Sequence, residues 1–367
     1  MDNVGKTDKY LIDGKIDILS VSKNELKDII KNKLNAEGFR AEQIYSWVYK
    51  TMGETDFAKM SNIPKIKQKI FEDNLYINKL DIIKKQISAD GTIKYLFGLH
   101  DENMIEGVFM RYNHGNTLCI STQVGCRMGC MFCASTMGGL TRNLLPSEML
   151  LQIMTAQRDT GERISNVVLM GIGEPLDNFD YVIKFLELVN SEDGLNIGYR
   201  HISVSTCGLV DKINKLKEIN IPVTLSVSLH APNDETRNKI MPVNNKWNVE
   251  KLLKSCREYA DFTKRRISFE YTLINNLNDS EEHARELALK IRNILCHVNL
   301  IPINEVKEKD FFPPNNKKSR MFQKILEDYG INATFRRKCG GDIDASCGQL
   351  RKNNLKQIKQ IKPKETD

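Results

Sequence analysis

The sequence lacks long apolar runs and has no apolar leader. No stretch reaches the roughly eighteen consecutive apolar residues of a transmembrane helix, and the opening segment MDNVGKTDKYLIDG is polar. These absences predict a cytoplasmic protein that does not enter a membrane. Hydrophobic residues make up 41% and charged residues 28% of the 367 residues, which is typical of folded soluble proteins and leaves disorder to the chain ends.

The chain also lacks the cysteine and histidine patterns of common structural frameworks. Nine cysteines in a chain expected in the cytosol argue against a disulfide framework and favour metal or redox chemistry. A structural zinc site would need a second CxxC or a suitably spaced histidine pair, and neither is present. The net charge of +7 is compatible with a polyanionic partner, but a solvated lysine-rich surface explains it equally well.

The N-terminal part predicts short helices followed by a few strands. Residues 36–50 place Phe39, Ile44, Trp47 and Val48 at helical spacing. Within 85–99, Asp90-Gly91 is a strong hairpin turn between two apolar-rich runs, and 103–112 has the pattern of a third strand. We expect this region to form a small α+β appendage.

From Asn116 onward, strand and helix patterns alternate. The expected strands are 117–122, 164–170, 201–206, 223–229, 266–273 and 296–301. Expected helices between them include 147–158, 181–190, 249–259 and 280–293. Several strands are apolar on successive residues, as in parallel strands buried on both faces. The pattern predicts an α/β fold with a parallel sheet, either doubly wound or a barrel.

Three cysteines follow the first strand of this alternating region. Cys126, Cys130 and Cys133 have the spacing Cx₃Cx₂C in a glycine-containing loop. Thiolates are the usual ligands of iron–sulfur clusters, and a [4Fe–4S] cluster normally takes four. Three cysteines leave one iron open to S-adenosylmethionine (SAM), whose reductive cleavage yields the 5′-deoxyadenosyl radical. A radical SAM enzyme is therefore favoured over a zinc site.

Loops after the strand ends carry further candidates, because (βα) barrels build their active sites there. Gly173 allows a ligand to approach the backbone closely, and Glu174 offers an acceptor for an amino group. The third glycine of a GxGxxG nucleotide motif is absent. Other contact candidates at strand ends are Ser205, Ser228, His230 and Asn304.

Two further cysteines stand apart from the cluster motif. Cys347 lies among glycines in GGDIDASCGQL, which predicts an irregular exposed loop and makes it a candidate nucleophile. Cys119 lies in the first strand of the alternating region, where a buried core cysteine is the simpler interpretation.

Five stretches together resemble the RlmN family, bacterial radical SAM methyltransferases that modify C2 of adenosine in 23S rRNA and tRNA. They are CISTQVGCRMGCMFCAST, MGIGEPLDN, SLHAPND, HVNLIP and GDIDASCGQLR. The resemblance implies a partial (βα) barrel of the radical SAM type over residues 96–350. It also implies a small N-terminal α+β accessory, RNA-binding domain over 1–95 and a basic tail over 351–367.

The resemblance implies a chemistry for the separate cysteines. Adenine C2 is electron-poor and cannot attack the SAM methyl group, so Cys347 takes the methyl first. A second SAM is cleaved at the cluster, and the resulting radical removes a hydrogen atom from the S-methyl group. The methylene radical formed in this way adds to C2. Glu106 accepts the C2 proton, and Cys119 releases the product and leaves a transient disulfide. One [4Fe–4S] cluster per chain and two SAM molecules per turnover are implied.

The resemblance also implies contacts and partners. The expected SAM contacts are Gly173, Glu174, Ser205, Ser228, Leu229, His230 and Asn304. The expected partners are 23S rRNA, tRNA and an electron donor such as flavodoxin or ferredoxin, with the protein a monomer.

Two alternatives stay open. A relative of Cfr would methylate C8 of the same rRNA adenosine, although such chains tend to carry Gly-Glu-Ala and His-Ser-Pro where this one has Glu174-Pro175 and His230-Ala231-Pro232. A non-catalytic iron–sulfur or zinc-stabilised RNA-binding protein would explain the charge and the cysteine motif, but not the alternating pattern or Cys347.

Overall fold

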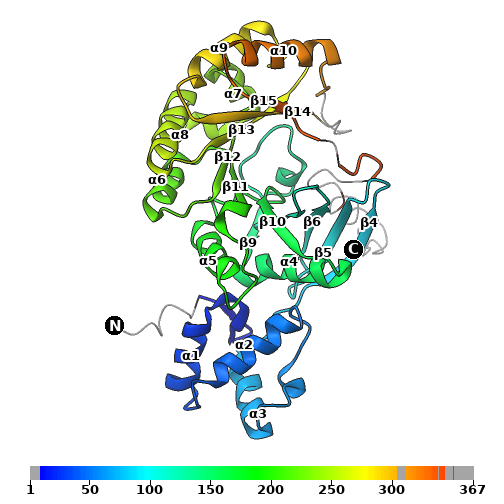
Figure 1. Cartoon of the computed structure of the whole chain (residues 1–367), viewed down its shortest axis with the longest axis vertical. Helices are drawn as coiled ribbons and strands as arrows, with labels where there is room; N and C mark the ends of the chain where they lie inside the picture. The colour runs from blue at the N-terminus through cyan, green and yellow to red at the C-terminus, as the bar shows by residue number, and fades with distance from the viewer. Residues whose placement is uncertain (1–8, 304–310, 338, 344–349, 351–367) are drawn as a thin grey trace, which may run out of the picture.

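The N-terminal part of the chain is a helical unit with a small sheet (Figure 1). The computed structural model describes residues 9–303, 311–337, 339–343 and 350. Three short strands form one sheet, β1 (Leu11–Ile12), β2 (Lys15–Asp17) and β3 (Leu75–Tyr76). The helices of the unit are α1 (Lys23–Asn32), α2 (Arg40–Lys50) and α3 (Lys65–Asn74), with 3₁₀ turns at Ile18–Ser20 and Phe57–Lys59.

Local sequence explains where these helices begin. Ser22 and Glu25 form a capping box at the start of α1, in which the Ser22 N–H donates to the Glu25 carboxylate at 2.7 Å. In α2, Ile44 and Val48 are buried as predicted. Phe39, expected on the same apolar face, precedes the helix and is 50% exposed. The helix begins four residues later than the predicted segment, so Phe39 falls outside its periodicity.

A ten-stranded sheet forms the body of the molecule, in the order β15-β14-β13-β12-β11-β10-β7-β6-β5-β4. Neighbouring strands from β7 to β15 in this order are parallel, which confirms the predicted α/β class and all six predicted strands. These strands are β7 (Asn116–Cys119), β10 (Ile164–Leu169), β11 (Ile202–Thr206), β12 (Thr224–Ser228), β13 (Ile267–Leu273), β14 (Cys296–Pro302) and the additional β15 (Ala333–Phe335).

Helices connect the parallel strands and lie along the outer side of the sheet (Figure 1). They are α4 (Pro146–Thr160), α5 (Phe179–Asn190), α6 (Val210–Ile219), α7 (Asp234–Ile240), α8 (Val249–Thr263), α9 (Glu281–Ile291) and α10 (Asn316–Asp328). Ser280, the first residue of the predicted helix 280–293, caps α9 by accepting from the His283 N–H at 3.2 Å. In the described part of the chain, no helix is both long and apolar enough to cross a membrane.

The remaining strands extend the sheet in antiparallel order. They are β4 (Asp81–Ile87), β5 (Ile93–Gly98) and β6 (Met104–Met110), and β6 pairs with β7. The predicted hairpin and third strand are present, with Gly91 in the turn at φ +81°. They join the long sheet rather than the helical unit, because backbone pairing along β7 continues through β6. The expected boundary between residues 95 and 96 falls inside β5.

The two faces of the sheet differ in chemistry. Strand registers align the side chains of Cys119, Val168, Ser203, Thr224 and their two-residue neighbours on one face, which we call the concave face. That face continues through Ser226, Ser268 and His297. The opposite face carries the apolar residues, among them Leu225, Phe269 and Leu300, all fully buried under the helices. Apolar and small or polar side chains therefore alternate along these strands. The predicted burial on both faces holds for β13, in which all residues but Ser268 are buried.

Candidate active site

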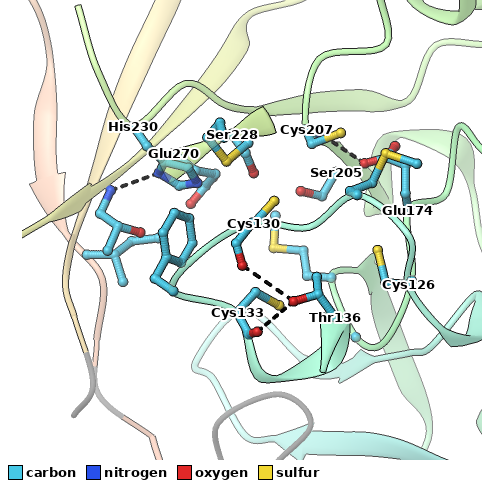
Figure 2. Close-up of a pocket in the computed structure, with 18 of the residues that line it drawn as sticks. Cys126, Cys130, Cys133, Thr136, Glu174, Ser205, Cys207, Ser228, His230 and Glu270 are labelled. Atoms are coloured by element: carbon cyan, nitrogen blue, oxygen red, sulfur yellow. Dashed lines mark hydrogen bonds between the residues drawn. The ribbon is translucent and has the colours of Figure 1, made fainter. Parts of the chain in front are cut away.

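A cavity of about 290 Å³ opens at the carboxyl ends of the parallel strands. All three cysteines of the cluster motif line it, together with residues from the ends of β10 to β14 (Figure 2). Its lining includes Cys126, Cys130, Cys133, Gly171, Gly173, Glu174, Ser205, Cys207, Ser228, His230, Glu270, Thr272 and Arg336. Carboxyl strand ends of parallel sheets are where α/β enzymes bind ligands.

The loop that carries the three cysteines is held by its own backbone and by α7. It follows β8 (Gln123–Gly125), which pairs with β9 (Leu140–Asn143). The Cys126 N–H donates to the Gly139 carbonyl at 2.9 Å, and the Met131 N–H donates to the Ile240 carbonyl at 2.9 Å. The Thr136 hydroxyl donates to the Cys133 carbonyl at 3.0 Å (Figure 2). The cysteines are thus presented together toward the cavity.

The environment of these thiols suits a cationic partner. Burial raises the pKa of Cys126 to about 12, and Cys133, Glu174 and Asp177 add to the effect. Burial likewise raises the pKa of Cys130, again with Cys133 and Cys126 contributing. The thiolate form therefore needs a positively charged ligand such as iron to be stable.

Cluster and single-ion sites make different geometric demands. Within the described residues, no three Cys, His, Asp or Glu side chains converge closely enough to hold a single metal ion. A [4Fe–4S] cluster needs no such convergence, because each thiolate binds its own iron. Cys126, Cys130 and Cys133 around one cavity fit that arrangement.

The loop after β10 brings backbone close to the cavity at Gly173. Its φ is +114°, and a Cβ there would lie 2.7 Å from the Gln123 Cβ. Glu174 is buried, and its two oxygens accept from the Leu176 N–H at 3.0 Å and the Cys207 N–H at 2.7 Å. Burial raises the pKa of Glu174, and these hydrogen bonds oppose that rise. Glu174 therefore ties the β10 and β11 loops together beside the cysteines.

The predicted contacts at the ends of β11 and β12 separate into two groups. Ser205, Ser228 and His230 line the cavity. Leu229 does not, because side chains alternate and its neighbour Ser228 faces the cavity. Leu229 is fully buried, and its carbonyl accepts from Arg237 Nε at 2.9 Å.

His230 is a neutral acceptor. Its Nδ1 accepts from the Thr272 N–H at 3.0 Å (Figure 2), and the backbone φ is +59°. Burial and the nearby Arg237 lower the pKa of His230 to about 3. The imidazole is therefore uncharged at neutral pH and carries its proton on Nε2.

A buried arginine that the sequence interpretation missed organises the strand ends. The Arg237 guanidinium is fully buried and donates to the carbonyls of Cys207, Ser228 and Leu229 at 2.7–3.0 Å. Its other contact is Asn244 Oδ1 at 3.0 Å. Arg237 thus fixes the ends of β11 and β12 relative to each other and places a positive charge near the thiols.

Glu106 and Cys119 lie on the same concave face, toward its antiparallel end. Cys119 pairs with Val108, two residues from Glu106, so both side chains share a face. Glu106 is 2% exposed and forms an ion pair of 2.6 Å with Lys94, whose side chain is 1% exposed. Neither Glu106 nor Cys119 lines the cavity itself.

The chain after β15 crosses the open side of the sheet toward β4. Arg336 lines the cavity, while the Gly340 N–H donates to Asp90 at 3.0 Å and Asp342 accepts from the Ala89 N–H at 3.0 Å. Leu350 is buried against Leu96 and Met104. The predicted residues Cys347 and Asn304 lie outside the described residues.

Glu270 and Thr272 are cavity residues that the sequence interpretation also missed. A signal for them exists, because Ser268, Glu270 and Thr272 alternate with Ile267, Phe269 and Tyr271 in RISFEYTL. A strand with one apolar and one small polar face points its polar side chains at a cavity when the apolar side is covered by helices.

This chain is similar to known proteins in both sequence and fold. Residues 120–288 match the radical SAM superfamily, and residues 16–77 match the ribosomal RNA large subunit methyltransferase N-terminal domain. The crystal structure of a radical SAM methyltransferase from Sphaerobacter thermophilus superposes with a TM-score of 0.85 at 40% identity, covering 90% of this chain and 98% of that one.

Full-length relatives are closer still in sequence. The "Probable dual-specificity RNA methyltransferase RlmN" of Clostridium tetani is 50% identical, over 94% of this chain and 99% of its own length. The protein of the same description from Alkaliphilus oremlandii is 52% identical, over 93% and 99%.

Fold and cavity together define a radical SAM enzyme, a class that uses a [4Fe–4S] cluster and SAM. Its parallel sheet and the N-terminal helical unit confirm the predicted fold class. The chain belongs to the RlmN family of methyltransferases, as its resemblance implied.

Proposed function

We propose that this enzyme methylates C2 of adenosine in 23S rRNA and tRNA through a methyl-cysteine at Cys347. The observation that carries the proposal is the shared concave face. Cys119 and the Lys94–Glu106 pair lie on the same face as the cysteine-lined cavity. Described residues on either side of Cys347 contact this end of the sheet. Asp342 accepts from the Ala89 N–H in the turn after β4, and Leu350 packs against Leu96 of β5 and Met104 of β6. Glu106, Cys119 and Cys347 would therefore act on the same substrate.

In this proposal each group of residues has one task. Cys126, Cys130 and Cys133 would hold one [4Fe–4S] cluster, which when loaded supplies the electron that cleaves SAM to a radical. Glu174, Ser205, Ser228 and His230 would position SAM beside it, and Gly173, Leu229 and Asn304 would contribute further contacts. Two SAM molecules would be used per turnover, one as methyl donor and one as radical source.

The remaining steps belong to the protein's own side chains. The Cys347 thiolate takes the methyl group from the SAM sulfonium by displacement. The radical derived from the second SAM would remove a hydrogen atom from the Cys347 S-methyl group, and the methylene radical would add to C2. Glu106 accepts the proton that C2 then loses, and the odd electron would return to the cluster. Cys119 attacks the Cys347 sulfur, so that an S–S bond forms as the S–CH₂ bond breaks. The released carbon takes the proton that the Cys119 thiol gives up, which frees the methylated adenosine and leaves a disulfide that a cellular reductant reopens.

Partners follow from the same proposal. The N-terminal unit, within the proposed accessory domain 1–95, and the basic tail 351–367 would contact RNA. The reductant of the cluster would be a flavodoxin or a ferredoxin, and the enzyme would act in the cytoplasm as a monomer. Because C2 must reach the radical centre, we expect an accessible, unstacked adenosine to matter more than a double-stranded region.

The experiment is a SAM-cleavage assay on anaerobically reconstituted protein. With reductant and an rRNA fragment, we expect 5′-deoxyadenosine and methylated RNA to form together. Absence of 5′-deoxyadenosine in the presence of RNA would favour the non-catalytic RNA-binding alternative. Methylation at C8 would instead favour the alternative in which the enzyme acts like Cfr.

A further inference from the structure

Glu270 is a second buried acid on the concave face, and the proposed roles above leave it unused. It projects from β13 into the cavity beside Ser228 and His230 (Figure 2), and it is 4% exposed. Strand register places it between Ser228 on β12 and Asn299 on β14. A carboxylate in this position is costly unless hydrogen-bond donors meet it.

Two neighbouring side chains orient this carboxylate without saturating it. Ser268 Oγ donates to Oε1 at 3.0 Å, and Asn299 Nδ2 donates to Oε2 at 2.7 Å. A carboxylate offers about four acceptor sites, so each oxygen keeps a further lone pair. Both donors are neutral and fix the direction of the group. The Arg336 cation, which also lines the cavity, acts on the carboxylate electrostatically. The remaining acceptor capacity of Glu270 faces the cavity.

The two acids of the cavity face different parts of it. Glu174 lies beside Cys207, and both of its oxygens are bonded to loop backbone. Glu270 lies with His230 and Ser228, on the other side of Cys130 (Figure 2). If the amino-carboxylate end of SAM is held near Glu174 and the cluster, the nucleoside end extends toward Glu270.

We propose that Glu270 binds the ribose of SAM, accepting hydrogen bonds from its 2′- and 3′-hydroxyls. Acidic side chains serve the same purpose in dinucleotide-binding folds, where one accepts from the ribose 2′-hydroxyl. Ser268 and Asn299 act as positioning residues that aim the carboxylate. This inference rests on the proposed function only in taking SAM as the ligand of the cavity.

Binding measurements test the inference without requiring turnover. Isothermal titration of the reconstituted full-length protein would compare S-adenosylhomocysteine with its 2′-deoxy and 3′-deoxy analogues. S-adenosylhomocysteine has no sulfonium charge, so any effect of Glu270 on its binding cannot come from that cation. We expect wild type to bind the deoxy analogues roughly 10- to 100-fold more weakly, as for loss of a hydrogen bond to a charged group. Glu270→Ala should weaken the parent ligand similarly and no longer distinguish the analogues.

A matched control and a milder variant complete the test. Glu286 also accepts from an asparagine, Asn233 at 2.6 Å, but lies outside the cavity. Glu286→Gln should keep wild-type discrimination. Ser268→Ala keeps the Glu270 carboxylate and should lose part of the discrimination between S-adenosylhomocysteine and its deoxy analogues. This variant tests the inference if Glu270→Ala does not fold.

The outcomes separate this inference from the proposed function. Equal wild-type affinity for the parent and deoxy ligands would overturn the role of Glu270 alone. Full discrimination in a folded Glu270→Ala protein would do the same. Wild type that binds no S-adenosylhomocysteine or SAM at all would overturn the proposed function, and this inference with it.

Discussion

Glu106 and Glu270 are both buried on the concave face, yet their surroundings differ. Glu106, at the antiparallel end, is 2.6 Å from the Lys94 ammonium. Glu270, in the parallel part, receives hydrogen bonds from Ser268 and Asn299 and lines the cavity. Glu106 is thus paired with a buried cation, whereas the neutral donors Ser268 and Asn299 orient Glu270 toward a ligand. In the proposed roles, the first region serves proton transfer and the second binds SAM.

The greatest predicted loss of activity comes from removing a cysteine of the cluster motif, because the proposed roles of both regions require SAM cleavage. Cys130→Ala should lower the iron content and reduce 5′-deoxyadenosine formation to the background, because the cluster loses one of its three thiolates. Iron and sulfide analysis with a SAM-cleavage assay measures both. Cys296→Ala, which removes a partly buried thiol outside the cavity, should leave them unchanged. A Cys130→Ala protein that still cleaves SAM would contradict the assignment.

Cys119→Ala should block release of the product without affecting the cleavage of SAM at the cavity. SAM would still be cleaved, but RNA would stay covalently attached because the releasing thiol is missing. Denaturing gels and mass spectrometry detect the adduct. The buried thiol of Cys256 in α8 provides a control, since Cys256→Ala should release its product. Recovery of inactive Cys119→Ala protein free of RNA would count against the role of Cys119.

Removing the partner of each acid should lower the free energy of unfolding by different amounts, with the larger loss at Glu106. Lys94→Met leaves Glu106 buried without its ion-pair partner and should lower the free energy of unfolding by roughly 3–5 kcal/mol. Ser268→Ala removes one neutral donor from Glu270 and should cost about 1–2 kcal/mol. Urea denaturation of the two variants gives the comparison. Equal costs would mean that the two carboxylates are held alike.

The smallest effect is a pH dependence at Glu270. Burial raises its pKa above the ordinary 4.5, and Arg336, Asn299 and Ser268 oppose the rise. The protonated form of Glu270 favours the folded state. The stability that it contributes is fully present below pH 4.5 and is lost as pH rises through the raised pKa. Wild type should therefore lose stability relative to Glu270→Gln as pH rises from 4.5 through the raised pKa of Glu270. A constant difference between the two proteins would contradict the shift.

Much of this arrangement can be predicted from local sequence. Helix caps such as Ser280, the Asp90-Gly91 turn and the parallel strands follow from short-range patterns. The three cysteines could be placed at one site because they share a loop. Membership of β4 to β6 in the long sheet could not be predicted, since strand pairing depends on partners distant in sequence.

The site was harder to predict where backbone geometry decides. Leu229 lies between two cavity residues, Ser228 and His230, but is fully buried and does not line the cavity. Arg237 looks like an ordinary helix residue in the sequence, and only its buried contacts with three carbonyls reveal its role. Glu270 could have been found from the alternation in RISFEYTL.

The most direct test of the central proposal is the position of the new methyl group. Reconstituted protein would be incubated with SAM, reductant and an rRNA fragment, and the digested nucleosides analysed by mass spectrometry and NMR. We predict 2-methyladenosine as the product. Exclusive formation of 8-methyladenosine, or SAM cleavage without methylated adenosine, would contradict the proposal.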